Sequence, residues 1–291
     1  MRILFITSNR IGDAVLSTGL LDHLLRAHAD ARFTVACGKV SEGLFVRMPR
    51  LERLISFDKR PRGLHWPPLW WATVRTRWDL VVDIRSSAIT WLLPTRRRAV
   101  MSRGPGHKIV QLAAVLGIAP PPFPVVWTGA QDRDRAAALL PAGAPIIAVA
   151  PTANWNGKLW PAERFVAVAE RLAGELGGAR IAIFAGPGAH EAALAAPVSA
   201  ALPGAIDLTG RLTLPEAAAC LARCAVFIGN DSGLMHLAAA AGCPTLGLFG
   251  ASNANAAEYA PAGPRTDVVE ASGMDAITVD AAHAAALKLL A

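Results

Sequence analysis

The strongest constraint on the fold is an alternation of apolar, strand-like runs with segments of helical periodicity, which begins at the first residues of the chain. In the amino-terminal half, such apolar runs occur at 2–7, 32–38, 54–58, 79–85 and 99–103. Continuous apolar strands that alternate with helices form parallel sheets with helices on both faces. The pattern therefore predicts an α/β domain of the doubly wound type.

The alternation starts again after a proline-rich break at 119–131. The second series of apolar runs lies at 145–151, 180–186, 206–210, 225–231, 245–250 and 266–270. Because 291 residues exceed what one hydrophobic core usually holds, two domains are expected. We predict two Rossmann-like, doubly wound parallel-sheet domains that face each other across a cleft. Their predicted bounds are 1–130 and 145–275, with a linker over 125–145 and a carboxy-terminal helix over 276–291.

Composition limits the classes of protein and of partner. Hydrophobic residues make up 53% of the chain, which excludes a disordered protein. No apolar run approaches the ~18–20 residues of a membrane span, and the first residues resemble a buried strand more than a signal peptide, so a cytoplasmic protein is predicted. The net charge of +7 favours an anionic partner, which could be nucleic acid, a phosphorylated substrate or an acidic membrane. The four cysteines form no metal-binding or disulfide pattern and are predicted to be buried thiols.

The most unusual stretch is G-N-D-S-G-L-M-H at 229–236, between an apolar run and an alanine-rich helix. Asn230, Asp231 and Ser232 are good helix caps, and capping alone is one interpretation. Capping needs only one side chain, however, and Gly233 also permits close approach of a ligand, while His236 lies one turn into the helix. Because a helix N-terminus favours anions, we predict a phosphate site here.

Three other strand-to-helix junctions carry polar residues. T-S-N-R-I-G-D at 7–13 is not a dinucleotide fingerprint, and Asp13 either complements a helix dipole or acts as a general base. P-T-A-N-W-N-G-K-L-W-P at 151–161 carries Lys158, which either neutralises phosphate or is a solvated loop lysine. A-G-P-G-A-H-E at 185–191 ends on Glu191, for which a dipole-complementing role is the simpler interpretation.

Taken together, these segments resemble glycosyltransferase family 9, the heptosyltransferases. The matching pieces are R-I-G-D, K-L-W-P, A-G-P-G-x-x-E and G-N-D-S-G-L-M-H-L-A-A-A-A-G-C-P-T-L-G-L-F-G, which occur in the family's order. The resemblance implies the GT-B architecture, in which the amino-terminal domain binds the acceptor and the carboxy-terminal domain binds the nucleotide-sugar. It also implies an inverting, metal-independent transfer without a cofactor, from a donor such as ADP-heptose to the lipopolysaccharide core.

The resemblance assigns roles to individual residues. Asp13 resembles the family's catalytic aspartate, which would accept the proton of the acceptor hydroxyl. Glu191 resembles a carboxylate that the family directs at the nucleotide ribose. Lys158, His236 and the N–H groups of Ser232 and Gly233 suit stabilisation of the leaving diphosphate, and Asp231 would organise that turn. Two further residues of the lysine loop, Thr152 and Asn154, would contact the diphosphate.

A basic, tryptophan-rich stretch covers 59–78, and R-R-R follows at 96–98. Tryptophan and arginine together suit a membrane interface with anionic headgroups, which predicts a protein peripheral to the inner membrane that approaches a lipid-linked acceptor. Alternatively, the tryptophans pack under a long loop. Nucleic acid is not predicted as a partner, because no recognised binding motif accompanies the charge.

Two other functions remain open at this point. A nucleotide-sugar epimerase of the same fold would isomerise the sugar without an acceptor. A non-catalytic nucleotide-sugar-binding protein would need no general base at Asp13.

Overall fold

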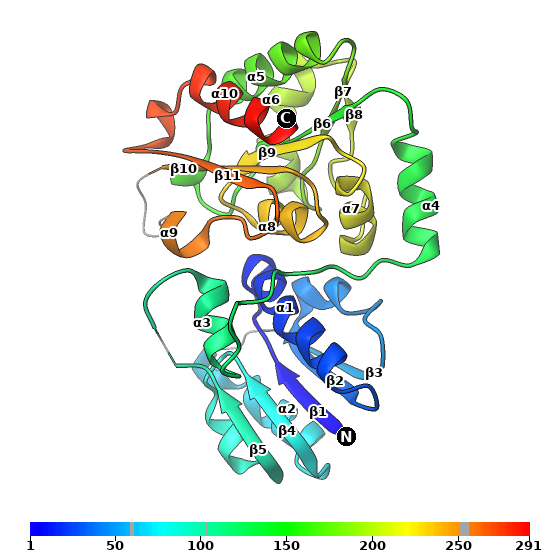
Figure 1. Cartoon of the computed structure of the whole chain (residues 1–291), viewed down its shortest axis with the longest axis vertical. Coiled ribbons are helices and arrows are strands. Elements are labelled where there is room, and N and C mark those ends of the chain that lie inside the picture. Colours follow the sequence, from blue (N-terminus) through cyan, green and yellow to red (C-terminus); the bar gives the residue numbers. More distant parts are fainter. Residues whose placement is uncertain (59–60, 103, 251–255) are drawn as a thin grey trace. The chain divides into compact units, whose positions relative to one another are not determined.

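A computed structural model describes residues 1–58, 61–102, 104–250 and 256–291 and divides the chain into two compact units, Met1–Trp127 and Thr128–Ala291 (Figure 1). Each unit holds one sheet, and every strand pairing in both sheets is parallel. The predicted pair of parallel-sheet α/β domains is confirmed, while the cleft between them stays a prediction. The predicted linker, 125–145, contains helix α4 (Ala130–Leu139), which belongs to the second unit.

The first unit contains a five-stranded sheet in the order β3-β2-β1-β4-β5. Its strands are β1 (Arg2–Ile6), β2 (Arg32–Gly38), β3 (Leu51–Phe57), β4 (Trp78–Asp83) and β5 (Thr95–Val100). The chain leaves the central β1 toward β2 and β3, then returns to β1's other side as β4. Ligands of such sheets bind at the carboxyl ends of the strands where the order reverses, here between β1 and β4.

The fifth strand exists, but its bounds were predicted wrongly. The apolar pattern placed it at 99–103, but β5 begins at Thr95 and includes the exposed Arg96, Arg97 and Arg98. The reason is its position at the edge of the sheet, where only one side is paired. Charged side chains are common on edge strands because they discourage pairing with other chains, so an apolar run is a poor guide there.

The helical elements of the first unit are α1 (Ile11–Ala27), η1 (Lys39–Leu44), η2 (Pro61–Gly63), α2 (Trp66–Thr73), η3 (Ala88–Leu92) and α3 (Lys108–Ala114). Side chains alternate across a strand, and Leu4 and Ile6 of β1 pack in one cluster with Leu69 of α2 and Ile89 of η3. Elements α2 and η3 therefore cover one face of the sheet together.

The tryptophans of the basic stretch have different environments. Trp78 is buried, and Trp66 and Trp70 pack partly buried against the cluster beneath α2, as the packing alternative predicts. Trp71 is 62% exposed. The basic residues Lys59 and Arg60 of the same prediction lie outside the described residues.

The second unit contains a six-stranded sheet in the order β11-β10-β9-β6-β7-β8. Its strands are β6 (Ile146–Ala150), β7 (Arg180–Ile183), β8 (Ile206–Asp207), β9 (Val226–Asn230), β10 (Thr245–Gly250) and β11 (Thr266–Ala271). The chain runs outward from β6 to β8 and then returns to β6's other side as β9. The reversal of strand order therefore lies between β6 and β9, and it brings together loops that are far apart in sequence.

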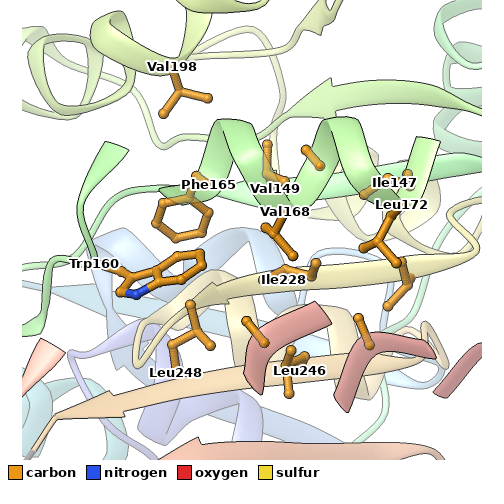
Figure 2. Close-up of a cluster of buried hydrophobic side chains, with 14 of the residues drawn as sticks. Ile147, Val149, Trp160, Phe165, Val168, Leu172, Val198, Ile228, Leu246 and Leu248 are labelled. Carbon is orange, nitrogen blue, oxygen red and sulfur yellow. The ribbon is translucent and has the colours of Figure 1, made fainter. Parts of the chain in front are cut away.

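Helices cover both faces of the second sheet. Helices α5 (Ala162–Glu175), α6 (Ala189–Ala201) and α10 (Val279–Leu290) lie on one face, and α8 (Gly233–Ala240) packs on β9 and β10 with α7 (Leu214–Leu221) beside it. The remaining short elements are η4 (Asn156–Lys158), α9 (Ala256–Tyr259) and η5 (Met274–Ala276). Figure 2 shows the core under α5, where Trp160 meets the ring of Phe165 edge-on, with centroids 4.9 Å apart.

All four cysteines are buried free thiols, as predicted. Burial raises the pKa of Cys37 to about 12 and that of Cys243 to about 12, because a thiolate loses its solvation in the core. Within the described ranges, no helix combines the length and the apolar character needed to cross a membrane.

Candidate functional site

Three loops at the carboxyl edge of the second sheet form the candidate donor site. They follow β9, β6 and β7, which are neighbours in the sheet. In doubly wound sheets this edge is where ligands bind. The sequence-predicted residues of the second unit all lie on these loops or on the first turn of the helices that follow them.

The β9–α8 junction does not use its polar side chains as caps. Ser232 is the N-cap of α8, but its side chain makes no capping hydrogen bond. The Asn230 side chain instead accepts a hydrogen bond from the backbone N–H of Trp160 (3.1 Å), and Asp231 binds the Lys158 ammonium. The capping interpretation is therefore wrong for Ser232, and Asp231 links the turn to the lysine loop.

The Lys158–Asp231 ion pair joins two strand ends that are 73 residues apart in sequence. The Lys158 side chain is 21% exposed and that of Asp231 is 9% exposed, so the pair is partly buried and screened less than a surface pair. The carboxylate holds the ammonium beside the start of α8. A cation and a helix N-terminus thus lie side by side, which is the arrangement that binds a phosphate group.

Two polar atoms near this junction have no partner among the described residues. They are Oγ of Ser232 and Nδ2 of Asn230, both inaccessible to solvent. A buried polar group without a hydrogen bond costs free energy. A ligand that offers oxygen acceptors could bind the free N–H groups of the first turn of α8.

The lysine loop, residues 151–161, is anchored near its carboxy-terminal end by Trp160. Trp160 is buried, and besides the bond from its N–H to Asn230, its indole Nε1 donates to the carbonyl oxygen of Ile277 (3.0 Å). These contacts hold the carboxy-terminal end of the loop against β9 and against the segment before α10. The position of Lys158, two residues earlier, is restricted as a consequence.

The other residues predicted to bind the nucleotide-sugar donor differ in burial and in contacts. His236 is buried one turn inside α8, and Gly233 is the first residue of that helix. Thr152 is buried and Asn154 is exposed, and neither side chain hydrogen-bonds to a residue in the described part of the chain. Glu191, in the first turn of α6, accepts a hydrogen bond from the backbone N–H of Gly186 (3.1 Å) and so shapes its own loop.

Asp13 lies in the first unit, in the first turn of α1 after β1. Ser8 donates a hydrogen bond from Oγ to Oδ2 of Asp13 (3.3 Å), and the same Oγ accepts from the backbone N–H of Arg10 (3.2 Å). Oδ1 of Asp13 makes no hydrogen bond to a described residue and can accept a proton. The carboxylate is thus oriented through one oxygen and free at the other.

The neighbouring strand end in the first unit carries a second polar network. Asp83 is fully buried at the end of β4 and accepts hydrogen bonds from the backbone and hydroxyl of Ser87 and from Thr90 (2.6 Å). The Arg85 guanidinium that follows donates to Oδ1 of Asn9, which lies in the loop after β1. These contacts join the two loops at the reversal of strand order, beside Asp13.

Sequence reasoning missed the positioning role of two residues. Ser8 orients Asp13, and Asn230 holds the lysine loop. Both lie in stretches that drew attention for their polar residues. Their partners could not be deduced, because the contact of Asn230 spans 70 residues and depends on which strands are neighbours.

Comparison with known proteins gives consistent matches. A family model described as glycosyltransferase family 9 (heptosyltransferase) matches residues 107–282, which include Lys158 and Asp231 but not Asp13. The lipopolysaccharide heptosyltransferase 2 of Salmonella typhimurium is 32% identical over 142 residues, which cover 45% of this chain and 40% of that protein. The lipooligosaccharide heptosyltransferase 2 of Haemophilus influenzae is 24% identical over 293 residues, covering 86% of this chain and 83% of that protein.

A solved structure, that of the E. coli ADP-heptose lps heptosyltransferase II, matches with a TM-score of 0.81. It is 20% identical in sequence, and the match covers 100% of this chain and 98% of that one. At this identity the likeness shows a shared fold, over both parallel-sheet units.

Proposed function

The chain belongs to glycosyltransferase family 9, the heptosyltransferase family, and we propose on that ground that it transfers heptose from ADP-heptose to a lipopolysaccharide-core acceptor. Membership confirms the resemblance read from the sequence motifs and disfavours the epimerase alternative. The donor and acceptor are those named for the E. coli relative of the same fold. The single observation that carries the proposal for the site is the Lys158–Asp231 pair beside the start of α8.

The donor diphosphate would bind at the β9–α8 junction. Lys158 would contact the phosphate oxygens as a cation while Asp231 keeps its ammonium in position. The N–H groups of Ser232 and Gly233 would donate to the same oxygens, with His236 behind them. These groups stabilise the charge that develops on the diphosphate as it leaves, which lowers the barrier to transfer.

Asp13 would act as the general base. Its free Oδ1 would accept the proton of the acceptor hydroxyl as that oxygen attacks the anomeric carbon of the heptose. The bond from the anomeric carbon to the diphosphate oxygen breaks on the opposite side, and nucleoside diphosphate leaves with the electron pair. Attack opposite the leaving group inverts the anomeric configuration.

No metal is required in this proposal, because Lys158 and the α8 N-terminus supply the positive charge at the diphosphate. Thr152 and Asn154 would add contacts to the diphosphate from the lysine loop, and Glu191 would contact the ribose. The acceptor is lipid-linked, so the protein would work in the cytoplasm as a peripheral protein of the inner membrane.

Calorimetric titration with ADP, UDP and GDP in EDTA tests the donor site. We expect ADP to bind with a micromolar Kd in the presence of EDTA. In Lys158→Ala the Kd for ADP should rise. A transfer assay with ADP-heptose and a core acceptor tests the reaction itself. Binding without transfer would favour the non-catalytic alternative, and loss of ADP binding in EDTA that magnesium restores would overturn the metal-independent mechanism.

A further inference from the structure

The first unit carries an exposed surface of tryptophan, leucine and arginine on the layer that covers one face of its sheet. We call it the tryptophan–arginine face. Its residues come from α2 and the turns on either side of it, from η3 and from β5. Its members are Leu64, Trp71, Arg75, Arg77, Trp91, Leu92, Arg96 and Arg98. Elements α2 and η3 contact each other and share one buried cluster below, so their outer sides belong to the same layer.

The apolar members are unusually exposed for their size. Trp71 is 62% exposed, Trp91 is 66% exposed and Leu92 is 65% exposed. Large exposed apolar side chains that gather on one surface mark an interaction site more often than a solvated surface. Leu69 of α2 and Ile89 of η3 are buried in the cluster against the sheet, so the exposed tryptophans are not needed to complete the core.

An arginine lies beside each of the two exposed tryptophans. The Arg75 guanidinium lies 5.0 Å from the centre of the Trp71 ring, and that of Arg98 lies 5.8 Å from the centre of the Trp91 ring. Arg98 is fixed by hydrogen bonds to the carbonyl oxygens of Thr90 (3.0 Å) and Leu93 (2.7 Å). Each tryptophan thus has a cation beside it. A shallow hollow of about 520 Å³ next to this layer is lined by Arg75, Arg77 and Arg96.

The charge of the chain is segregated toward this unit. Residues 1–127 contain 19 Lys and Arg against 8 Asp and Glu, a net charge of +11, whereas residues 128–291 contain 10 against 14, a net charge of −4. On the face itself the acidic residues are few: Asp83 is fully buried, and Asp79 is engaged by Arg96 (3.2 Å) and by the backbone of Arg2 (2.8 Å). The exposed charge of the face is therefore positive.

We propose that the tryptophan–arginine face docks the protein on an anionic lipid bilayer. Tryptophan side chains partition to the headgroup level of membranes, and arginine is attracted to acidic headgroups. Two exposed tryptophans of this face each lie beside an arginine, which suits a headgroup layer with charged groups above and acyl chains below. This deepens the proposed function by naming the surface that would bring the enzyme to a lipid-linked acceptor, and docking needs neither donor nor acceptor.

Vesicle sedimentation tests the proposal with matched variants. The probes are vesicles of phosphatidylglycerol with phosphatidylcholine and vesicles of phosphatidylcholine alone. Trp71→Ala is compared with Trp155→Ala, whose tryptophan is 54% exposed on the second unit, and Arg75→Glu is compared with Arg135→Glu, an exposed arginine of α4. A thermal melt of each variant verifies that it is folded.

We expect the protein to sediment with the anionic vesicles at low salt and to remain in solution with the neutral ones. Arg75→Glu should weaken binding about fivefold or more, because one basic residue near an anionic surface contributes about 1 kcal/mol. Trp71→Ala should also weaken binding, because the variant lacks the indole that partitions to the headgroup level. The two control variants should bind as the wild type does. The proposal is overturned if the wild type ignores anionic vesicles, or if the controls lose as much binding as the face variants.

Heptose transfer to a delipidated, soluble acceptor is measured on the same variants. Since Trp71 and Arg75 lie outside the proposed catalytic residues, transfer should be unchanged in both Trp71→Ala and Arg75→Glu. Loss of vesicle binding with intact transfer would support docking through this face, and absence of transfer in the wild type would contradict the proposed function while leaving the docking result standing.

Discussion

Replacing Asn230 by alanine tests the anchoring of the lysine loop. Asn230 and Trp160 are both buried, and the Asn230 side chain accepts the hydrogen bond from the Trp160 N–H at 3.1 Å. In Asn230→Ala that N–H remains in the core without an acceptor, which costs about 1–3 kcal/mol. For a unit of the size of residues 128–291, each kcal/mol lowers the melting temperature by about 2–4 °C. The melting temperature should therefore fall by about 2–12 °C.

The same substitution should weaken nucleotide binding. Lys158 lies two residues before Trp160, in a loop whose other end is free of regular structure. When the anchor is lost, the loop loses conformational entropy each time ADP binds, and this cost weakens the binding free energy. A cost of about 1.4 kcal/mol would raise the Kd for ADP about tenfold. Differential scanning calorimetry gives the melting temperature, and isothermal titration with ADP gives the Kd.

Asn156→Ala is the matched control for this experiment. Asn156 lies in the same loop, is exposed, and its side chain makes no hydrogen bond to the described residues, so its removal should change stability by less than about 0.5 kcal/mol. Equal melting temperatures and equal Kd values for the two variants would refute the role assigned to Asn230. A fall in melting temperature without a change in Kd would keep the packing role and refute the coupling to Lys158.

Three further predictions concern the base, the cation and the thiols. Asp13→Asn should lower the rate of heptose transfer about 10²–10⁴-fold and leave the Kd for ADP unchanged, because a general base acts only on the acceptor hydroxyl; equal initial rates would contradict that role. Lys158→Ala should raise the Kd for ADP about 10- to 100-fold, because a hydrogen bond to a charged group contributes about 1.5–3 kcal/mol. An unchanged Kd in the titration would exclude the lysine from the site. Burial raises the pKa of Cys37 from 9.0 to about 12, so between these pH values only the unfolded thiol loses its proton. The free energy of unfolding should therefore decrease as the pH rises from 9 toward 12, less steeply in Cys37→Ala, as denaturant titrations across this range would measure.

The fold was predictable from local pattern in most of the chain. Buried strands such as β1, β6 and β9 are continuous apolar runs, because both of their faces are covered by helices. Strand β5 lacks this pattern, and its exposed arginines follow from its place at the edge of the sheet. Whether a strand is central or at the edge depends on pairing with distant strands, which local periodicity does not contain.

The candidate site was predictable in its residue types and not in its contacts. Lys158, Asp231 and Ser232 stood out because polar residues at strand ends are expensive unless they are used. The structure adds contacts that the sequence did not indicate: Asp231 pairs with Lys158, and the Ser232 side chain forms no capping bond. The tryptophan-rich stretch shows the same limit, since Trp78 is buried while Trp71 is exposed within one basic segment.

The sequence by itself determined the order of strands and helices, the two-unit organisation and the motifs of the family, because these depend on periodicity and on residues close together in the chain. Only the tertiary structure decided that β6 lies beside β9, and with it that Lys158 meets Asp231 and that Asn230 holds Trp160. It also decided which tryptophans reach the surface. The physical reason is that burial and long-range hydrogen bonds are properties of packed layers, and the choice of neighbours in a sheet is made by the whole core.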